Sequence, residues 1–489
     1  MQPSSQSIDP RTPLLVGVGT AAESAPVTEL MTQACRAAAA DAGAPSLLAA
    51  VDRIALPQGS WSLVDPARIV VRAIGATGAR TYRYEIGVSQ QEIINDALAA
   101  IVAGDADVIL VMGAEARAHS RLAGDELDVP TGPPDVTVTR QPDFVAPVEL
   151  AAGIVVPPVQ QYALIENALA AHEQTSLEDQ QQEIARLWAR FNDVAQENPL
   201  AAFGSPRTAG VIAKAGRKNR PLAFPYNVWH ASQWTVDQGA ALLICAAGVA
   251  RDAGVTTDRW VFPHVALHSS QAITLTARRD LHAWPAMEVL GRAAADHLGH
   301  PLAEIPIMDV YSCFPAAVRV QQRALGLNRA GTPTVTGGMT FGGGPFNNYV
   351  FNATAAVVQL LRQQPEASGL VTTVCGMLSK PGLAVWSASP PESPGAALVA
   401  DLAGEAAAHT ATCPVADPVT AQGPATVASF TVTFDPVDRL RPVRTAIVAD
   451  LGDGTRTAAT CEDATIAQHA LTESLIGRTV HVERVAFSL

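Results

Sequence analysis

The sequence has no cysteine framework. Its 489 residues contain six cysteines, spread along the chain without a CxxC pair. Such spacing is typical of reduced thiols and argues against a disulfide scaffold. It gives no ligand set for zinc either, so we expect no metal.

Long apolar runs and a basic N-terminal segment are also missing. No apolar run reaches about 18 residues, the length that a membrane span needs. The start, MQPSSQSIDPRT, lacks the basic residues and apolar core of a signal peptide. We therefore expect no membrane span and a cytoplasmic location.

Basic residues are scarce: the chain has 33 lysines and arginines against 46 acidic residues, which gives a net charge of −13. Nucleic acid binding needs clustered cations, so this balance argues against it. The densest basic run is KAGRKNR, with Lys214, Arg217, Lys218 and Arg220. It is either a solvated surface run or a seat for ligand phosphates.

Strands alternate with helices in the first part of the chain. The patterns predict strands over 13–19, 52–56, 81–86 and 107–112, and helices over 27–42, 66–74 and 90–103. This alternation indicates an α/β fold with a mostly parallel sheet between helical layers.

A related unit recurs later in the chain. SQQEIINDALAAIVAG followed by DADVILVMGAE corresponds to PFNNYVFNATAAVVQLL followed by SGLVTTVCGM. With Asn95 laid on Asn352, each helix precedes an apolar strand that ends at a glycine, Gly113 or Gly376. The sequence therefore predicts the same fold twice.

Two other segments follow different patterns. Residues 118–235 are rich in proline and contain an amphipathic helix that starts after Ser176. Residues 392–489 begin as a linker and continue as strands over 428–434, 444–451, 456–461 and 480–487, with an LGDG turn signal. We expect four units, with a small β-barrel last: 1–117, 118–235, 236–391 and 392–489.

Three loops concentrate the chemistry. A short strand over 305–310 precedes Cys313, and Phe314-Pro315 opens a helix. The glycine-rich stretch GGMTFGGGPFNN covers 337–348, and a strand ends in VTTVCGM over 371–377. Loops of this composition favour a polar ligand against exposed backbone amides.

These loops, in this order, resemble the thiolase superfamily, and sterol-carrier-type thiolases and their thiolase-like relatives in particular. YSCF stands where those enzymes carry HDCF, GGMTFGGGP where they carry GGxxxxGHP, and CGM where they carry CxG. The resemblance implies a duplicated five-layer α-β-α-β-α fold. The additional C-terminal domain resembles the small barrel, reminiscent of oligonucleotide-binding folds, of thiolase-like proteins of the first type.

The resemblance implies acyl transfer on coenzyme A through a cysteine at a helix N-terminus, assisted by a histidine and a second cysteine. Ser89 stands at the nucleophile position and Gly344 at the histidine position, whereas Cys375 retains the CxG cysteine. Ser89 is more simply an N-cap. Thiolase activity is therefore expected to be lost.

Other candidates keep two interpretations. Cys313 is either a core thiol or a substitute nucleophile, and Cys375 is either structural or a proton carrier. Asn347, beside Asn348, either donates to a thioester carbonyl or forms a turn. Gly338 and Gly343 would hold the thioester, and the basic run would hold the phosphates.

Three functional hypotheses follow. The first is a protein that binds coenzyme A or acyl-coenzyme A as a ligand without turning it over, with no covalent cofactor. The second is an acyltransferase or thioester carbon–carbon lyase that uses Cys375 or Cys313. The third is an interaction or scaffold protein without coenzyme A binding.

Partners are harder to predict than ligands. Residues 401–489 hold 11 acidic and 6 basic residues, which favours docking of the barrel on a protein over nucleic acid. Thiolases pair through the strand before the nucleophile helix. Here that strand, TYRYEI, alternates charged with aromatic residues, which disfavours edge pairing and favours a monomer over the family's dimer.

Overall fold

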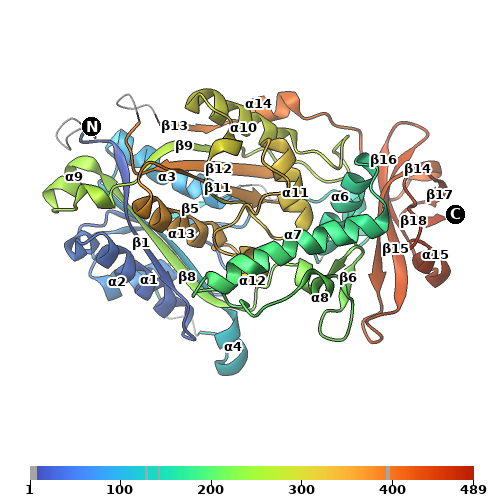
Figure 1. Cartoon of the computed structure of the whole chain (residues 1–489), viewed down its shortest axis with the longest axis horizontal. Helices are drawn as coiled ribbons and strands as arrows, with labels where there is room; N and C mark the ends of the chain where they lie inside the picture. Colours follow the sequence, from blue (N-terminus) through green and yellow to red (C-terminus); the bar gives the residue numbers. More distant parts are fainter. Residues whose placement is uncertain (1–7, 127–129, 141–143, 156, 392–396) are drawn as a thin grey trace.

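The computed structural model of the chain describes residues 8–126, 130–140, 144–155, 157–391 and 397–489. These residues form three β-sheets, two of which stack with helices between and outside them (Figure 1). Within the described ranges, no helix combines the length and the apolar character needed to cross a membrane.

The first sheet has the strand order β1-β8-β4-β2-β3-β5. β2 is parallel to β3 and β4, whereas β8 is antiparallel to both of its neighbours. β4 is buried throughout, as its apolar run predicts. The strands are β1 (Pro13–Ala21), β2 (Arg53–Pro57), β3 (Arg80–Tyr84), β4 (Val108–Ala116), β5 (Val136–Val138) and β8 (Asp237–Ala246).

The second sheet repeats this arrangement in the order β10-β11-β12-β9-β13. β12 is antiparallel and lies between β11 and β9, just as β8 lies between β4 and β1. The predicted duplication is therefore confirmed. The strands are β9 (Phe262–His268), β10 (Ile307–Asp309), β11 (Ser368–Cys375), β12 (Lys380–Ser387) and β13 (Leu398–Asp401).

Helices complete a five-layer α-β-α-β-α body. α3 (Gln90–Ala103) and α13 (Tyr349–Gln363) lie between the sheets, and α3 contacts β4 of one sheet and β9 of the other. α1 (Val27–Asp41) and α2 (Pro66–Ile74) cover the first sheet. α10 (Pro285–Leu298) covers the second, with α11 (Pro315–Ala324) beside it. The predicted thiolase-type layering is confirmed.

The third sheet closes into a five-stranded barrel, because β14 pairs with β15 as well as with β17. The LGDG turn joins β15 to β16 as predicted, but the strand predicted over 480–487 is two strands broken at Arg484, whose φ is 57°. Residues 392–396, at the predicted linker, lie outside the described ranges. The barrel strands are β14 (Gln422–Phe434), β15 (Pro442–Leu451), β16 (Arg456–Cys461), β17 (Thr479–Glu483) and β18 (Ala486–Ser488).

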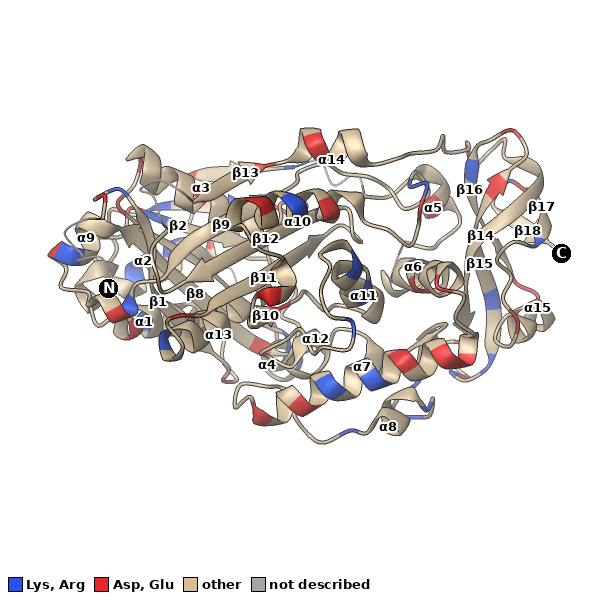
Figure 2. Cartoon of the chain, turned by 45° about the horizontal axis from the view of Figure 1, so that its top comes forward, with Lys and Arg blue, Asp and Glu red and all other residues tan. Residues whose placement is uncertain are grey.

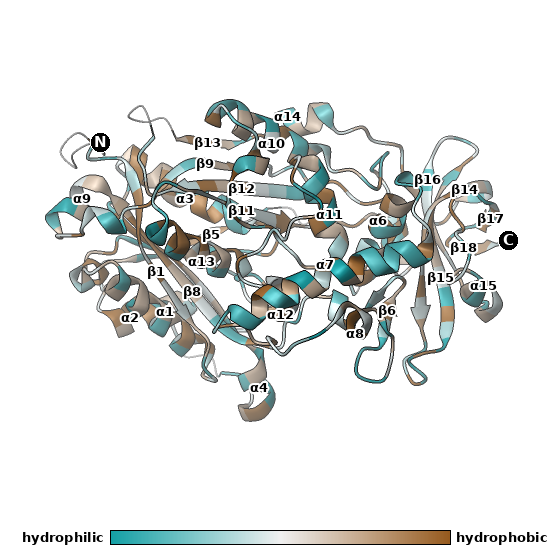
Figure 3. Cartoon of the chain, viewed as in Figure 1, coloured by the Kyte–Doolittle hydropathy of each residue, from teal (hydrophilic) through white to brown (hydrophobic). Residues whose placement is uncertain are grey.

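The proline-rich insertion links the body to the barrel. Its long helix α7 (Leu177–Glu197) starts at Ser176, whose Oγ accepts a hydrogen bond from the Asp179 amide at 3.1 Å. α7 buries an apolar stripe and keeps a polar outer face (Figure 3). The insertion also contains α4 (Arg117–Ala123), α5 (Pro147–Ala151), α6 (Val159–His172), α8 (Ala209–Ala213), β6 (Pro221–Ala223) and β7 (Tyr226–Asn227).

Short elements complete the described chain. They are α9 (Ala247–Asp252), α12 (Gly338–Phe341), α14 (Ala403–His409) and α15 (Ala464–His469), with single 3-10 turns over Pro45–Leu48, Val228–His230, Thr257–Arg259 and Leu302–Glu304.

The strand TYRYEI is not a free edge, which corrects the premise of the sequence argument about pairing. β5 runs parallel to β3, with Val136 opposite Tyr82 and Val138 opposite Tyr84. β5 has only three residues in a proline-rich segment, so it carries no strand-length pattern that the sequence would reveal. The chain itself covers the edge of β3.

Candidate functional site

The predicted nucleophile position is the start of α3. Ser89 is its N-cap and is 2% exposed, and its Oγ accepts a hydrogen bond from the Glu92 amide at 3.2 Å. No histidine of the described residues is hydrogen-bonded to Ser89. The hydroxyl therefore caps the helix, as its position in the sequence predicts.

The other central helix starts beside α3. Gln90 Oε1 accepts a hydrogen bond from the Val350 amide at 2.8 Å, and Asn347 Nδ2 donates to the Gln58 carbonyl at 3.1 Å. Asn348 is 2% exposed, and neither polar atom of its amide group has a hydrogen-bond partner among the described residues. An unpaired amide at the meeting point of two helix N-termini suits a polar ligand group or water.

The glycine loop between β10 and α13 needs its glycines. Gly337, Gly338 and Gly343 have φ values of 86°, 69° and 115°, in the left-handed region that glycine favours. A Cβ on Gly338 would also lie 2.5 Å from Phe191 Cδ1. The loop is fixed to the strand end before Cys313, because the Met339 amide donates to Ser312 Oγ at 3.0 Å.

Ser232 occupies the space where the resemblance expects a histidine. A Cβ on Gly344 would lie 2.0 Å from Ser232 Oγ and 3.1 Å from the Met339 carbonyl. Backbone bonds hold Ser232 there, since its amide donates to the Cys313 carbonyl at 2.9 Å and the Gly344 amide donates to the Gln233 carbonyl at 2.9 Å. A side chain at position 344 would therefore require Ser232 Oγ to move.

Cys313 lies in the core before α11. It is 8% exposed, and burial raises the pKa of its thiol to about 12 despite a hydrogen bond with Tyr162. The backbone amides of Cys313 and Phe314, at the start of α11, act in the opposite direction but do not outweigh burial, and the Ala316 amide donates to the Tyr226 hydroxyl at 3.0 Å instead. Cys313 is therefore a neutral thiol at ordinary pH.

Cys375 ends β11 and is half-buried. Burial raises its pKa to about 11, while Lys380, opposite it in the hairpin, acts in the other direction. Lys380 Nζ donates to the Gly87 carbonyl at 2.8 Å and lies 5.1 Å from the centre of the Phe144 ring. This contact brings Cys375 next to the segment that leads to Ser89.

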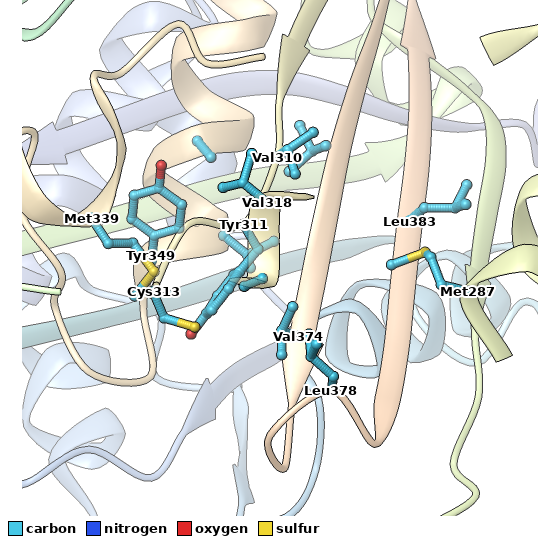
Figure 4. Packing of buried hydrophobic residues seen from close by; sticks show 14 of the residues in the cluster. Met287, Val310, Tyr311, Cys313, Val318, Met339, Tyr349, Val374, Leu378 and Leu383 are labelled. Atoms are coloured by element: carbon cyan, nitrogen blue, oxygen red, sulfur yellow. The ribbon is translucent and has the colours of Figure 1, made fainter. Parts of the chain in front are cut away.

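Tyr311 lies between the two cysteine loops. Its ring and Cys313 point into the same space, with Val374 and Leu378 opposite (Figure 4). Burial raises the pKa of Tyr311, and negative charge on Cys313 or Cys375 would raise it further. Tyr311 is 8% exposed, and its hydroxyl makes no hydrogen bond within the described chain, which is unusual for a buried polar group.

The basic run lies away from these loops, at the barrel side of the insertion. Lys214, Arg217 and Lys218 are exposed and Arg220 is half-buried. Buried Asn219 shapes the run, because its Nδ2 donates to the Ile212 carbonyl at 2.8 Å and its Oδ1 accepts from the Trp229 amide at 2.9 Å.

One short segment, residues 228–233, connects the basic run to the glycine loop. At one end, the Val228 amide donates to the Arg220 carbonyl at 3.0 Å. At the other end, the Gln233 amide donates to the Met339 carbonyl at 3.0 Å. The structure thus brings Ser89, Cys313, Cys375, Asn347 and the glycine loop together, with the basic run at the far end of this segment.

Sequence reasoning missed Ser232 and Phe144 as parts of this site. Phe144 packs on the CxG turn, where a Cβ on Gly376 would lie 2.2 Å from Phe144 Cδ1. Both residues come from the insertion, and neither belongs to a motif. The sequence contained one indication of Tyr311, because this residue stands where the family motif HDCF has its histidine.

No protein-family model matches this sequence, and no curated protein matches it. Among solved structures, it is similar to a monomeric SCP2-thiolase like protein type 1 from Mycobacterium smegmatis, with 30% identity, 98% of both chains covered and a TM-score of 0.82.

More distant structures are similar in fold alone. The Ltp2-ChsH2(DUF35) aldolase has 19% identity, with 78% of this chain and 98% of that chain covered and a TM-score of 0.57. Human mitochondrial 3-ketoacyl-CoA thiolase has 16% identity, with 77% and 98% covered and a TM-score of 0.53.

The doubled sheets, the central helices and the three loops define a protein of the thiolase-like class. Identity of 30% over 98% of the chain goes further, because a match of that length extends into the C-terminal barrel. The chain belongs to the family of SCP2-thiolase-like proteins type 1, as its sequence predicts.

Proposed function

We propose that this protein binds coenzyme A or acyl-coenzyme A and does not perform Claisen chemistry on it. The absence of Claisen chemistry rests on one observation, the position of Ser232 against Gly344. Residue 344 is glycine, so the activating imidazole is absent, and Ser232 Oγ lies 2.0 Å from where a side chain at 344 would begin. Ser89, already used as an N-cap, supplies no nucleophile in its place.

The proposed binding of coenzyme A rests on the glycine loop and the CxG loop, which this chain retains. The thioester would lie against Gly338, Gly343 and Gly344, with Cys375 beside it. The Gly343 amide would donate to the thioester oxygen, because it makes no hydrogen bond within the described chain, whereas the amides of Gly338 and Gly344 already donate to Thr334 Oγ1 and to the Gln233 carbonyl. The phosphates would lie at the basic run, and the segment over 228–233 would guide the pantetheine arm between the two.

The test is titration calorimetry with coenzyme A and acetyl-coenzyme A, paired with a thiolysis assay. We expect saturable binding with both ligands and no thiolysis above background. The charge reversal Lys218→Glu should weaken binding, whereas Arg186→Glu, on the exposed face of α7, should leave it unchanged. Absence of binding to either ligand would instead favour an interaction protein that docks partners through its barrel.

A second candidate is carbon–carbon cleavage of a β-hydroxyacyl-coenzyme A. Tyr311 favours it, because this hydroxyl has no hydrogen-bond partner in the described chain and lies between two cysteine loops. Tyr311 would act as the phenolate, which is a minor species because burial raises its pKa but is for the same reason a strong base. It would take the β-hydroxyl proton while the Cα–Cβ bond breaks, giving a carbonyl compound and an enolate. The Cys375 thiol would protonate the enolate carbon, and the proton on Tyr311 would then pass to the Cys375 thiolate, which restores both groups. One structural neighbour is itself an aldolase.

Tyr311→Phe tests this second candidate. It should abolish release of the carbonyl product and leave the affinity for acyl-coenzyme A within about twofold, because only the proton carrier is lost. Equal loss of binding and cleavage would mean that Tyr311 has a structural role.

The same proposal includes a monomer. The SCP2-thiolase like protein from Mycobacterium smegmatis is monomeric. In this chain β5 covers the free side of β3, so the strand that thiolases use for pairing already has a partner.

A further inference from the structure

The hairpin between β14 and β15 has a fixed tip. Asp435 Oδ1 accepts hydrogen bonds from the amides of Val437 at 2.7 Å and Asp438 at 2.8 Å. The Asp435 amide donates to the Arg441 carbonyl at 2.9 Å, and the Asp435 carboxylate forms an ion pair with the Arg441 guanidinium. The charge of Arg441 is therefore compensated within the hairpin.

Arg439, two residues earlier, has no such compensation. It is exposed and forms no ion pair within the described chain. Its charge lies near that of Arg220 at the end of the basic run, because burial first and the positive charge of Arg439 second lower the pKa of Arg220. Two cations that lie close together repel each other.

Backbone pairing brings these two cations together. β6, which follows Arg220, bridges to β14 with Ala223 opposite Thr433. The Phe224 amide donates to the Val432 carbonyl at 2.9 Å, and the Phe224 ring stacks on Phe430 with centroids 6.3 Å apart. The basic run and the β14–β15 hairpin thus meet where β6 pairs with β14, a junction called the seam below.

Positive charge is concentrated at this seam in an otherwise acidic chain, as the loop beyond α8 beside the barrel indicates (Figure 2). None of its five cations forms an ion pair with a described residue. Repulsion among them is relieved when a polyanion binds. They are Lys214, Arg217, Lys218, Arg220 and Arg439.

We propose that the C-terminal barrel completes the phosphate site for coenzyme A, with Arg439 binding a phosphate together with Arg220. This rests on the proposed function and deepens it, because it gives the barrel a role in ligand binding. Arginine suits that role, since its planar guanidinium donates two parallel hydrogen bonds to a phosphate.

Two arginines of the same hairpin provide a matched test. Calorimetric titration of the full chain with coenzyme A, at low ionic strength, should give a Kd about tenfold higher for Arg439→Ala than for the wild type. Arg441→Ala removes a charge of the same sign from the same hairpin tip, but Arg441 is already paired with Asp435. The Kd of this variant for coenzyme A should therefore stay within about twofold of the wild-type value. Unchanged thermal unfolding of both variants verifies that the hairpin is intact.

Fragments of coenzyme A distinguish two claims: that the protein binds coenzyme A, and that Arg439 of the barrel binds its phosphates. Adenosine 3′,5′-bisphosphate should compete with coenzyme A and lose affinity in Arg439→Ala, whereas pantetheine should bind wild type and variant equally. Equal Kd values for coenzyme A in the wild type and Arg439→Ala would overturn the role of the barrel while leaving the proposed function standing. A wild type that binds pyrophosphate but no coenzyme A would overturn both.

Discussion

Burial governs the reactivity of the thiols at the site. A cysteine at a helix N-terminus is a nucleophile only as the thiolate, and the thiolate is penalised in an apolar environment. Burial raises the pKa of Cys313 to about 12 and that of Cys375 to about 11. Both are therefore almost fully protonated at neutral pH, Cys375 slightly less so.

Alkylation with iodoacetamide should follow this order. The modification rate of Cys375 should rise about tenfold per pH unit between pH 7 and pH 10, because the thiolate fraction grows as pH approaches its raised pKa. Peptide mapping by mass spectrometry would measure the rate, and Cys375→Ser is the control. A fast rate at pH 7 that changes little on raising the pH would contradict the assigned environment.

Position 344 gives a second prediction at the residue scale. Gly344→Ala should lower the free energy of unfolding by about 1–2 kcal/mol, because its Cβ would meet Ser232 Oγ. Ser232→Ala removes that oxygen and should restore most of the loss when the two changes are combined. Urea unfolding of both single variants and the double variant measures the coupling, and strict additivity would argue against the contact.

At the scale of elements, α11 depends on a buried ion network. Arg319 is 6% exposed and forms ion pairs with Glu166, Glu173 and Glu183. Glu166 is fully buried, and it also accepts a hydrogen bond at 2.7 Å from the Tyr226 hydroxyl that contacts the start of α11. The network fixes the helix that follows Cys313.

Arg319→Met should destabilise the fold by about 3–5 kcal/mol at pH 8, because Glu166 would stay buried without its cation. Burial raises the pKa of Glu166 above its ordinary value even in the wild type. Ionisation of Glu166 therefore lowers the free energy of unfolding as pH rises through its raised pKa. Loss of Arg319 would raise the pKa of Glu166 further. The destabilisation should be smaller at pH 5 than at pH 8, because a larger fraction of Glu166 binds a proton at the lower pH.

Arg323→Met is the matched control, since Arg323 is 34% exposed and shares only Glu173 with the network. It should cost no more than about 1 kcal/mol at either pH. Denaturant unfolding at the two pH values distinguishes the variants, and equal losses would contradict a central role for Arg319.

Local patterns were enough to predict several elements. Ser176 caps α7, the LGDG turn joins two barrel strands, and the echo around Asn95 and Asn352 is a true duplication. Each of these signals lies within a short window of sequence. The CxG, YSCF and glycine loops were predictable as one site because strand ends of a repeated fold converge.

Contacts between distant segments were not predictable. Ser232 fills the place of a histidine only because its backbone is held by Cys313, and Phe144 covers Gly376 from another part of the insertion. β5 is too short for a periodic pattern, and the break at Arg484 follows from one residue with positive φ. The predicted domain boundaries and the likeness of the barrel to oligonucleotide-binding folds stay predictions.

At the scale of the whole molecule, the covered edge of β3 predicts a monomer of 51.0 kDa. Replacing the β5 segment 136–138 with glycines should expose that edge and produce dimers or larger species. Size-exclusion chromatography with light scattering measures the mass of both proteins. A dimeric wild-type protein would contradict the inference that β5 covers the edge of β3 and prevents pairing.

In the proposed function, the molecule is a scaffold that holds a thioester without attacking it. A crystal structure of the protein soaked with acetyl-coenzyme A tests this claim most directly. We predict an intact thioester between the glycine loop and Cys375, with the phosphates at the seam of Lys214, Arg217, Lys218, Arg220 and Arg439. An acetyl group on Cys313, Cys375 or Ser89 would contradict the claim.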